Sequence, residues 1–299
     1  MTGSRIRISI VILNYNRLEE TRHTVAFLRE LIAGRNDTEV IAIDNGSSDG
    51  TGSYLNSQSD FLTPVMLPEN RGVGGYAAGF ERGQGDYLLV LDDDSHPRDG
   101  VTLDRLIEQL DSVPKTGVVA CRIEDGNGKR ISTWHLPRQD LKGPSMAFVG
   151  CGFAIRRRLF EEIGWYAEHF FLYQNDVDVA FQVYLRGFSI VYDPGCRVIH
   201  RVASANRSRK RQVFYATRNS LWLIRMYYTW PGKVYLLASR ALIGLLRGLQ
   251  FVEPGAYLRG LREGLSAPVE RRPLPARLRT QFVPFWRQNS ILHQVLRRE

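Results

Sequence analysis

Strand-like and helix-like patterns of hydrophobic residues alternate through the first hundred positions of the chain. Residues 8–14 (ISIVILN) and 39–45 (EVIAIDN) are nearly continuous apolar runs, as expected for strands buried on both faces. Residues 17–34 have apolar positions at helical spacing. Further strands are predicted at 65–70 and 86–94, separated by a glycine-rich turn and a small-residue helix at 72–83. This order predicts an α/β fold with a mostly parallel sheet.

Polar clusters follow three of these predicted strands: Asn14 to Asn16, Asp44 to Asp49, and Asp92 to Asp94. The carboxyl ends of parallel strands meet at one edge of a sheet, and ligands bind there. We therefore expect the three clusters to share one site, although any single polar strand end is ordinary.

The second half mixes strand and helix patterns before it becomes helical. Strands are predicted at 117–123, 148–155 and 189–200, and helices at 156–163 and 175–188. From residue 211 onward the pattern is helical and rich in Leu and Arg, with a proline-rich link at 267–278 before a last short segment. The layout predicts an α/β domain at 1–210 and a helical extension at 211–299.

Charge is distributed unevenly along the chain, whose net charge is +9. Residues 1–200 contain 21 Lys/Arg and 27 Asp/Glu, whereas residues 201–299 contain 19 Lys/Arg and 4 Asp/Glu. A basic tail favours an anionic partner. No recognised nucleic-acid module accompanies it and the body is acidic, so a nucleic-acid partner is not expected.

Segment 233–265 of this tail mixes Leu, Tyr and Phe with Arg240, Arg247, Arg259 and Arg262. One interpretation is an amphipathic helix that lies on an anionic bilayer, which would make the protein a peripheral membrane protein. The alternatives are a helix packed on the catalytic domain and a homodimer interface.

The three cysteines are far apart and show no zinc or disulfide spacing, and the N-terminus shows no signal-peptide pattern. These features predict a cytoplasmic protein, at the inner face of the membrane if the tail binds lipid.

The run Asp92-Asp93-Asp94 is the densest acidic cluster of the chain. On an extended strand end, Asp92 and Asp94 would point the same way and Asp93 would point elsewhere. Two converging carboxylates suit Mg²⁺ or Mn²⁺. The alternative is a solvated loop.

Other candidates have equally simple structural alternatives. The glycines at 72, 74 and 75 allow a phosphate to approach the backbone, or form a tight turn. Asp44 suits a ribose or base contact, or a turn. Asp176 and Asp178 suit a general base, or the N-cap of the following helix. His200 suits a metal, or a structural role.

Taken together and in order, several segments resemble family 2 glycosyltransferases, which are inverting enzymes with the GT-A fold. These segments are SIVILNYNRLEET, AIDNGSSDGT, NRGVGGYAAGF, LVLDDDSHP, FFLYQNDVDVAFQVYLRGF and VIH. The resemblance covers roughly residues 6–230. The segment VFYATRNSLWLI (213–224) further resembles the rhamnosyl- and galactofuranosyl-transferase branch.

The resemblance implies a role for each matching position. It implies a metal held by Asp92, Asp94 and His200, and Asp176 as the catalytic base. The implied nucleotide-sugar contacts are Leu13, Asn14, Asn16, Asp44, Asn70, Arg71, Gly72, Gly75, Asp92 and Asp93. Acceptor contacts are assigned to Asn175, Asp178, Trp134 and Gly152. Asn175 departs from the family, which usually has an acid before the base, so the base is Asp176 or, failing that, Asp178.

The implied reaction moves a sugar from a UDP- or dTDP-sugar to a hydroxyl of a glycan or lipid-linked glycan, with Mg²⁺ or Mn²⁺ as cofactor. Two other functions compete with it. A sugar nucleotidyltransferase should carry a glycine-rich basic loop after the first strand, whereas this chain has NYNRLEET there. A non-catalytic nucleotide-sugar-binding protein would not need Asp92, Asp94, Asp176 and His200 together.

Overall fold

The computed structural model describes residues 5–201 and 208–288. The chain divides into two compact units. The first contains residues up to 169 together with 182–203, and the second contains residues 170–181 together with those from 204 onward. The division near residue 203 lies close to the expected limit at 210. However, the short stretch 170–181 groups with the C-terminal helices, which local sequence patterns do not reveal.

The first unit is built on a nine-stranded sheet. Eight strands follow one another in the order β3-β2-β1-β4-β8-β6-β9-β5, and β7 pairs with β9. The strands are β1 (Ile8–Asn14), β2 (Thr38–Asn45), β3 (Thr63–Leu67), β4 (Tyr87–Asp92), β5 (Ser95–Pro97), β6 (Thr116–Glu124), β7 (Gly143–Pro144), β8 (Phe153–Arg156) and β9 (Ser189–His200).

Strands β3, β2, β1 and β4 are all parallel, and β6 is parallel to β9, whereas β8 runs antiparallel between β4 and β6. The central strands are the apolar runs of the sequence. Residues 10–12, 41–43 and 88–91 are fully buried. Because β-branched and aliphatic side chains fill both faces of these strands, the sheet is the core of this unit. The α/β prediction is therefore confirmed.

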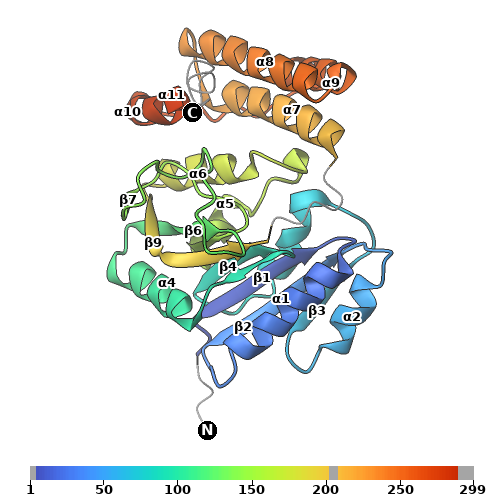
Figure 1. Cartoon of the computed structure of the whole chain (residues 1–299). Helices are drawn as coiled ribbons and strands as arrows, with labels where there is room; N and C mark the ends of the chain where they lie inside the picture. The colour runs from blue at the N-terminus through green and yellow to red at the C-terminus, as the bar shows by residue number, and fades with distance from the viewer. Residues whose placement is uncertain (1–4, 202–207, 289–299) are drawn as a thin grey trace. The chain divides into compact units, whose positions relative to one another are not determined.

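Helices cover the sheet of the first unit, and α1 crosses β1 and β2 (Figure 1). They are α1 (Leu18–Leu31), α2 (Thr51–Ser57), η1 (Gly72–Tyr76), α3 (Ala77–Phe80), α4 (Gly100–Ser112), α5 (Arg157–Ile163) and η2 (Glu168–Phe170). Thr102 N donates to Asp99 Oδ1 at 2.9 Å, which caps α4. The boundary between the two units falls inside α6 (Asn175–Leu185).

Within residues 208–288 the chain forms the helices α7 (Arg209–Tyr227), α8 (Gly232–Gln250), α9 (Pro254–Ser266), α10 (Ala276–Gln281) and α11 (Val283–Gln288). Helix α7 packs against α8 and α9 through glycines. A Cβ on Gly260 would come 2.7 Å from Phe214 O, and one on Gly264 would come 2.7 Å from Leu221 Cδ1. Small residues therefore let the helix backbones approach closely. Among the described residues, no helix combines the length and hydrophobicity required to cross a membrane.

Several boundaries differ from those predicted. The third strand is Thr63–Leu67 rather than 65–70, because the chain bends at Pro68. Residues 149–152 form a turn rather than a strand, since Gly152 N donates to Val149 O. Helix α6 ends at Leu185 rather than 188, and Gly187 follows it with φ of 78°. Part of the predicted last segment, 289–299, lies outside the described residues.

Candidate functional site

The three polar strand ends of the first unit lie at one edge of the sheet. In the parallel register, Asn14 of β1 pairs with Asp44 of β2, and Leu13 of β1 pairs with Asp92 of β4. The expectation that these clusters meet is confirmed, because consecutive parallel strands in this sheet end level with one another.

Arg17, just beyond β1, neutralises two of the three aspartates. Its Nη1 donates to Asp93 Oδ1 at 2.5 Å, and its Nη2 donates to Asp94 Oδ2 at 2.9 Å. Both carboxylates are buried, at 5% and 1% exposure. Because β4 ends at Asp92 and the chain turns at 93–94, the strand alternation stops. The prediction that Asp93 would point away from Asp94 is therefore wrong, since one guanidinium binds both.

Asp92 is held separately by a neighbouring tyrosine. Tyr76 OH donates to Asp92 Oδ1 at 3.1 Å and to Leu91 O at 2.6 Å. Burial, and then the negative charge of Asp94, raise the pKa of Asp92 above its ordinary value. Burial also raises the pKa of Asp93 to about 7, although Arg17 opposes the shift. The edge is thus an environment in which uncompensated negative charge is unfavourable.

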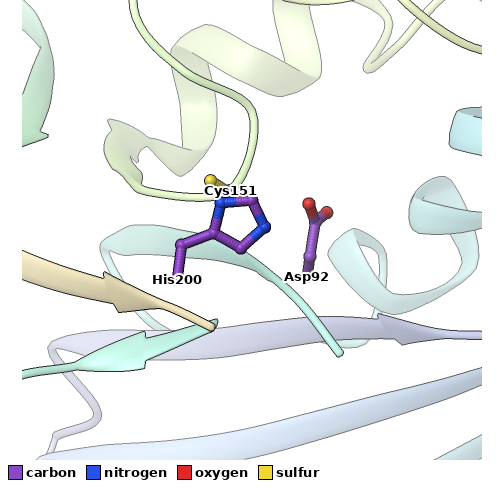
Figure 2. Close-up of side chains that lie close together, drawn as sticks. All are labelled: Asp92, Cys151 and His200. Carbon is purple, nitrogen blue, oxygen red and sulfur yellow. The ribbon is translucent and has the colours of Figure 1, made fainter. Parts of the chain in front are cut away.

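His200, the last residue of β9, faces this acidic group. Its Nε2 lies 3.1 Å from Asp94 Oδ1. The side chains of Asp92, Cys151 and His200 also point toward one another (Figure 2), and each offers a ligand atom within 4.8 Å of the other two. Two carboxylates, one imidazole and one thiol therefore converge where β4 and β9 end.

The protonation of this group follows from its contacts. Burial alone would lower the pKa of His200, but Asp94 and Cys151 raise it to about 11. Burial alone would raise the pKa of Asp94, but His200 and Arg17 hold it below the ordinary range. Burial raises the pKa of the Cys151 thiol. In the protein without ligand, a cationic imidazole therefore faces an ionised Asp94.

Asn45, at the end of β2, holds the glycine-rich loop in place. Its Nδ2 donates to Asn70 Oδ1 at 3.1 Å and to Gly72 O at 3.0 Å, and its Oδ1 accepts from Arg71 N at 3.0 Å. Gly75 packs against the same side chain, since a Cβ there would come 2.7 Å from Asn45 Oδ1. The predicted loop residues Asn70, Arg71, Gly72 and Gly75 are thus brought beside the strand ends.

The side chain of Arg71 is engaged inside the first unit. Its guanidinium forms an ion pair with Glu168. The same glutamate packs on Gly74, where a Cβ would come 2.9 Å from Glu168 Cγ. The loop is therefore fixed by its backbone through Asn45 and by a side chain through Glu168.

The remaining strand-end candidates divide into open and enclosed positions. Asp44 accepts from Ser47 N at 3.3 Å, which is a turn contact. Asn16, with φ of 51°, accepts from Ser48 N at 2.7 Å. Asn14 is completely buried and bonds to Ile43 O and to Thr21. Leu13 is half-buried. The Asn14 side chain therefore ties β1 to its neighbours, and Asp44 and Asn16 shape the loops around the edge.

In the second unit, Asp176 and Asp178 have different contacts at the start of α6. Asp176 Oδ1 accepts from its neighbour Val177 N at 2.9 Å. Asp178 Oδ1 accepts from Tyr227 OH at 2.6 Å, and both partners are buried. Asp178 thus fastens α6 to α7, which is a structural task.

Asn219 of α7 holds the turn that leads into α6. Its Nδ2 donates to three backbone carbonyls of this turn: Phe170 O at 2.8 Å, Leu172 O at 2.7 Å and Tyr173 O at 3.0 Å. Phe171, Tyr173 and Gln174 all have positive φ, which is costly for residues with a side chain. A buried amide therefore stabilises the strained backbone that positions Asp176.

The acceptor candidates are scattered. Asn175 begins α6 in the second unit, whereas Trp134 and Gly152 belong to the first. Trp134 is half-buried, and the centre of its ring lies 3.9 Å from that of His135, with the two rings tilted by 34°. A Cβ on Gly152 would come 2.6 Å from Ile123 Cδ1, so close packing explains this glycine.

Sequence reasoning missed Arg17, Asn45, Cys151 and Asn219. Arg17 had a usable signal, because it is the cation directly after the first strand and the aspartates required a positive neighbour. The other three are uncharged residues whose roles depend on contacts with distant segments.

The fold and the edge geometry define a GT-A glycosyltransferase, and comparisons with known proteins agree. The chain is similar to a solved mannosyltransferase of Pyrobaculum calidifontis, in complex with GDP-Man and Mn²⁺, with a TM-score of 0.61, 17% identity, and coverage of 98% of this chain and 83% of that one. It is also similar to Staphylococcus aureus TarS in complex with UDP-GlcNAc, with a TM-score of 0.60, 15% identity, and coverage of 87% and 80%.

Residues 9–178 match the family model described as glycosyl transferase family 2, and the chain belongs to this family. A probable glycosyltransferase, YdaM of Bacillus subtilis, is 27% identical over 63% of this chain, which spans only 49% of that protein's length. The Mycobacterium tuberculosis N-acetylglucosaminyl-diphospho-decaprenol L-rhamnosyltransferase is 25% identical to this chain, and the match covers 67% of this chain and 82% of the length of that protein.

Proposed function

We propose that this glycosyltransferase moves a sugar from a UDP- or dTDP-sugar to a hydroxyl of a glycan or lipid-linked glycan, with inversion at the anomeric carbon. The observation that carries the proposal is the meeting of Asp44, Asp92 and His200 at the sheet edge. There an anionic donor would meet a metal held by carboxylates and a neutral imidazole, beside a loop of backbone N–H groups.

The donor set at this edge fits a hard divalent cation. Asp92 and His200 offer ligand atoms within 4.8 Å of each other, and Asp94 Oδ1 lies 3.1 Å from His200 Nε2. Carboxylate oxygens and imidazole nitrogens are ligands that Mn²⁺ and Mg²⁺ accept. We assign the metal to these three residues rather than to Cys151, because a thiol is a soft donor. A bound Mg²⁺ or Mn²⁺ would neutralise charge on the donor diphosphate and so assist departure of the nucleotide.

The protein's own residues would prepare the donor. Arg17 holds Asp93 and Asp94 in fixed positions through a two-pronged ion pair. Asn45 holds the loop 70–72, whose backbone would face the diphosphate, while Asp44 would accept from the nucleoside. These assignments rest on the resemblance to family 2 enzymes and on the local geometry.

Asp176 is the proposed base that takes the proton of the attacking hydroxyl. Its competitor Asp178 already accepts the Tyr227 hydroxyl at 2.6 Å, and a buried acceptor used in this way is poorly suited to proton removal. Attack on the face opposite the departing nucleotide inverts the anomeric centre in one displacement, without a covalent intermediate.

The name of the mycobacterial relative directs the proposal to a rhamnosyl donor and a lipid-diphosphate acceptor. The run Asp92-Asp93-Asp94 more closely resembles the galactofuranosyltransferases of this branch, in which the metal strand carries several aspartates. A panel of nucleotide-sugars decides between them: dTDP-rhamnose, UDP-galactofuranose, UDP-GlcNAc and GDP-mannose, each with Mn²⁺ and with EDTA. We expect slow metal-dependent release of nucleoside diphosphate from one donor.

The same assay separates the two competing functions. A sugar nucleotidyltransferase would release sugar phosphate when given pyrophosphate, and a binding protein would retain the donor without turnover. Turnover that is equal with Mn²⁺ and with EDTA would contradict the assigned metal site. Failure to bind or turn over any donor would contradict the proposed function.

A further inference from the structure

The second unit contains a cavity that the transfer reaction does not require. It has a volume of about 620 Å³ and lies among α8, the segment before it, and α10–α11. This is the size of small-molecule binding pockets. All its lining residues belong to the second unit: Tyr228, Thr229, Trp230, Pro231, Gly232, Tyr235, Leu236, Ser239, Arg240, Arg279, Thr280, Val283, Trp286 and Arg287.

The lining combines positive charge with aromatic walls. Three of its residues are arginines and none is an aspartate or glutamate. Aromatic rings at Tyr228, Trp230, Tyr235 and Trp286 supply the apolar surface. A cavity of this composition is complementary to a molecule with an anionic group and an apolar body.

Arg240 is the most informative residue of this lining. Its Nε is buried and has no hydrogen-bond partner among residues 5–201 and 208–288, while the side chain as a whole is half-buried. Its side chain lies over the Trp286 ring, with Cζ 4.7 Å from the ring centre. Trp286 in turn donates from Nε1 to Tyr228 OH. The guanidinium is therefore held in a defined place with its Nε unpartnered.

This arrangement is unfavourable in the protein alone. Burial, and then the nearby Arg247, lower the pKa of Arg240 to about 10. An anionic ligand would favour the charged form of this half-buried guanidinium. Arg279, which donates to Leu274 O, and the exposed Arg287 add further positive charge to the lining.

The surface beside the cavity is apolar. Trp230 and Tyr235, which line the cavity, are 77% and 68% exposed. Along α8, Tyr235, Leu242, Leu246 and Leu249 recur at helical spacing, and all four are exposed. An acyl or isoprenoid chain whose anionic head entered the cavity would cover this stripe.

We infer that this cavity binds a phosphate ester carried on an apolar chain, with Arg240 as the principal contact to the phosphate. Phosphate suits the site because a guanidinium binds its oxygens by paired, charge-assisted hydrogen bonds. Ser239 and Thr229 place hydroxyl groups in the same lining. Two sources share this chemistry, a membrane phospholipid and an isoprenoid phosphate, and both are tested below.

The test measures binding to the full-length protein by calorimetry, with no sugar donor present. The ligands are geranyl diphosphate and octyl phosphate, with octyl glucoside and inorganic phosphate as the uncharged and chain-free controls, all below their micelle concentrations. We expect saturable binding of both phosphate amphiphiles, at least about tenfold tighter than either control, because each control lacks one of the two complementary parts.

Arg240→Met keeps the length and packing of the side chain but removes its charge. We expect this variant to bind the phosphate amphiphiles roughly 10- to 100-fold more weakly, as for the loss of charge-assisted hydrogen bonds. Its melting temperature without ligand should equal or exceed that of the native protein, since burial disfavours the cation that has been removed. The matched control is Arg262→Gln on α9, an exposed arginine outside the cavity, which should bind normally.

If Arg240→Met does not fold, Arg287→Gln decides, because Arg287 lines the cavity and is exposed. This variant should bind several-fold more weakly. Equal binding of octyl phosphate and octyl glucoside would overturn the inference. Binding of inorganic phosphate as tight as that of octyl phosphate would also overturn it. So would an Arg240→Met variant whose affinity for the phosphate amphiphiles is unchanged or, if that variant does not fold, an Arg287→Gln variant with unchanged affinity.

Flotation with vesicles identifies the source of the phosphate. Arg240-dependent flotation with phosphatidylglycerol vesicles, but not with phosphatidylcholine vesicles, would indicate a phospholipid. Arg240-dependent binding of geranyl diphosphate without vesicle flotation would indicate an isoprenoid phosphate. None of these measurements depends on transfer activity. The inferred phosphate binding in the cavity and the proposed transfer function are therefore tested independently of each other.

Discussion

Arg17 donates from Nη2 to Asp94 Oδ2 at 2.9 Å, and the other prong of the same guanidinium binds Asp93. The arginine is only 15% exposed, so the pair lies largely out of water. It joins the residue after the first strand to the turn after the fourth, and thereby allows three consecutive acids to exist at one strand end.

Replacement of Arg17 tests this role. Arg17→Met removes the guanidinium from two buried carboxylates, of which Asp94 keeps its contact with His200. We expect a loss of about 3 kcal/mol in the free energy of unfolding. Urea denaturation measures the change. Arg22→Met is the matched control, because Arg22 pairs with Glu19 on the exposed surface of the same helix and should cost less than about 1 kcal/mol. Equal losses in both variants would contradict the assignment.

Replacement of the proposed base tests the mechanism. Asp176→Asn keeps the size of the side chain and its contact with Val177 N, but it cannot take a proton. We expect kcat to fall by about 10² to 10⁴, while donor affinity stays within a few-fold. Steady-state kinetics measures kcat, and calorimetry measures the affinity for the donor. A variant with near-native kcat would show that the base lies elsewhere.

Asp178 should behave as a structural residue. Tyr227→Phe removes the hydroxyl that donates to the buried carboxylate of Asp178, and the loss of this hydrogen bond should cost about 1–3 kcal/mol of stability. In contrast, Asp178→Asn retains an acceptor for Tyr227 and should keep kcat within several-fold of native. A loss of kcat in Asp178→Asn as large as that in Asp176→Asn would instead identify Asp178 as a catalytic participant.

Asn219 should act on catalysis by positioning the turn before Asp176. Asn219→Ala removes three hydrogen bonds to strained carbonyls, and we expect kcat to fall about tenfold or more with donor affinity unchanged. Ser220→Ala, one residue away on α7, loses only a bond to Ala216 O and is the control. If donor affinity and kcat fell together in Asn219→Ala, general destabilisation would explain the effect better than positioning.

The glycine-rich loop provides a test of donor binding that leaves the acids intact. Gly75→Ala places a Cβ 2.7 Å from Asn45 Oδ1, and the clash should displace the side chain that holds residues 70–72. We expect donor affinity to weaken about tenfold in calorimetry. Gly100→Ala, with nothing within 4 Å of the new Cβ, should be silent. Native affinity in Gly75→Ala would show that the loop does not contact the donor.

The sequence by itself determined the sheet and the edge at which its polar strand ends gather. Continuous apolar runs at β1, β2 and β4 can be buried only in a central parallel sheet, and parallel strands bring their carboxyl ends to one edge. Asp44 and Asp92 could therefore be assigned to one site without coordinates. The order of the sequence segments was also enough to identify the family, because each of its motifs is formed by neighbouring residues.

Tertiary structure decided which side chains at that edge bind one another. Strand alternation predicted that Asp92 and Asp94 would converge and that Asp93 would point elsewhere. Asp92 and Asp94 both lie beside His200, but the turn after Asp92 also lets Arg17 bind Asp93 together with Asp94. Cys151 joins Asp92 and His200 from a loop whose path no local pattern specifies. Asn219 and Arg240 have their roles only through contacts with residues distant in sequence. Such contacts depend on which segments come together in the fold, and hydrophobic periodicity does not predict that.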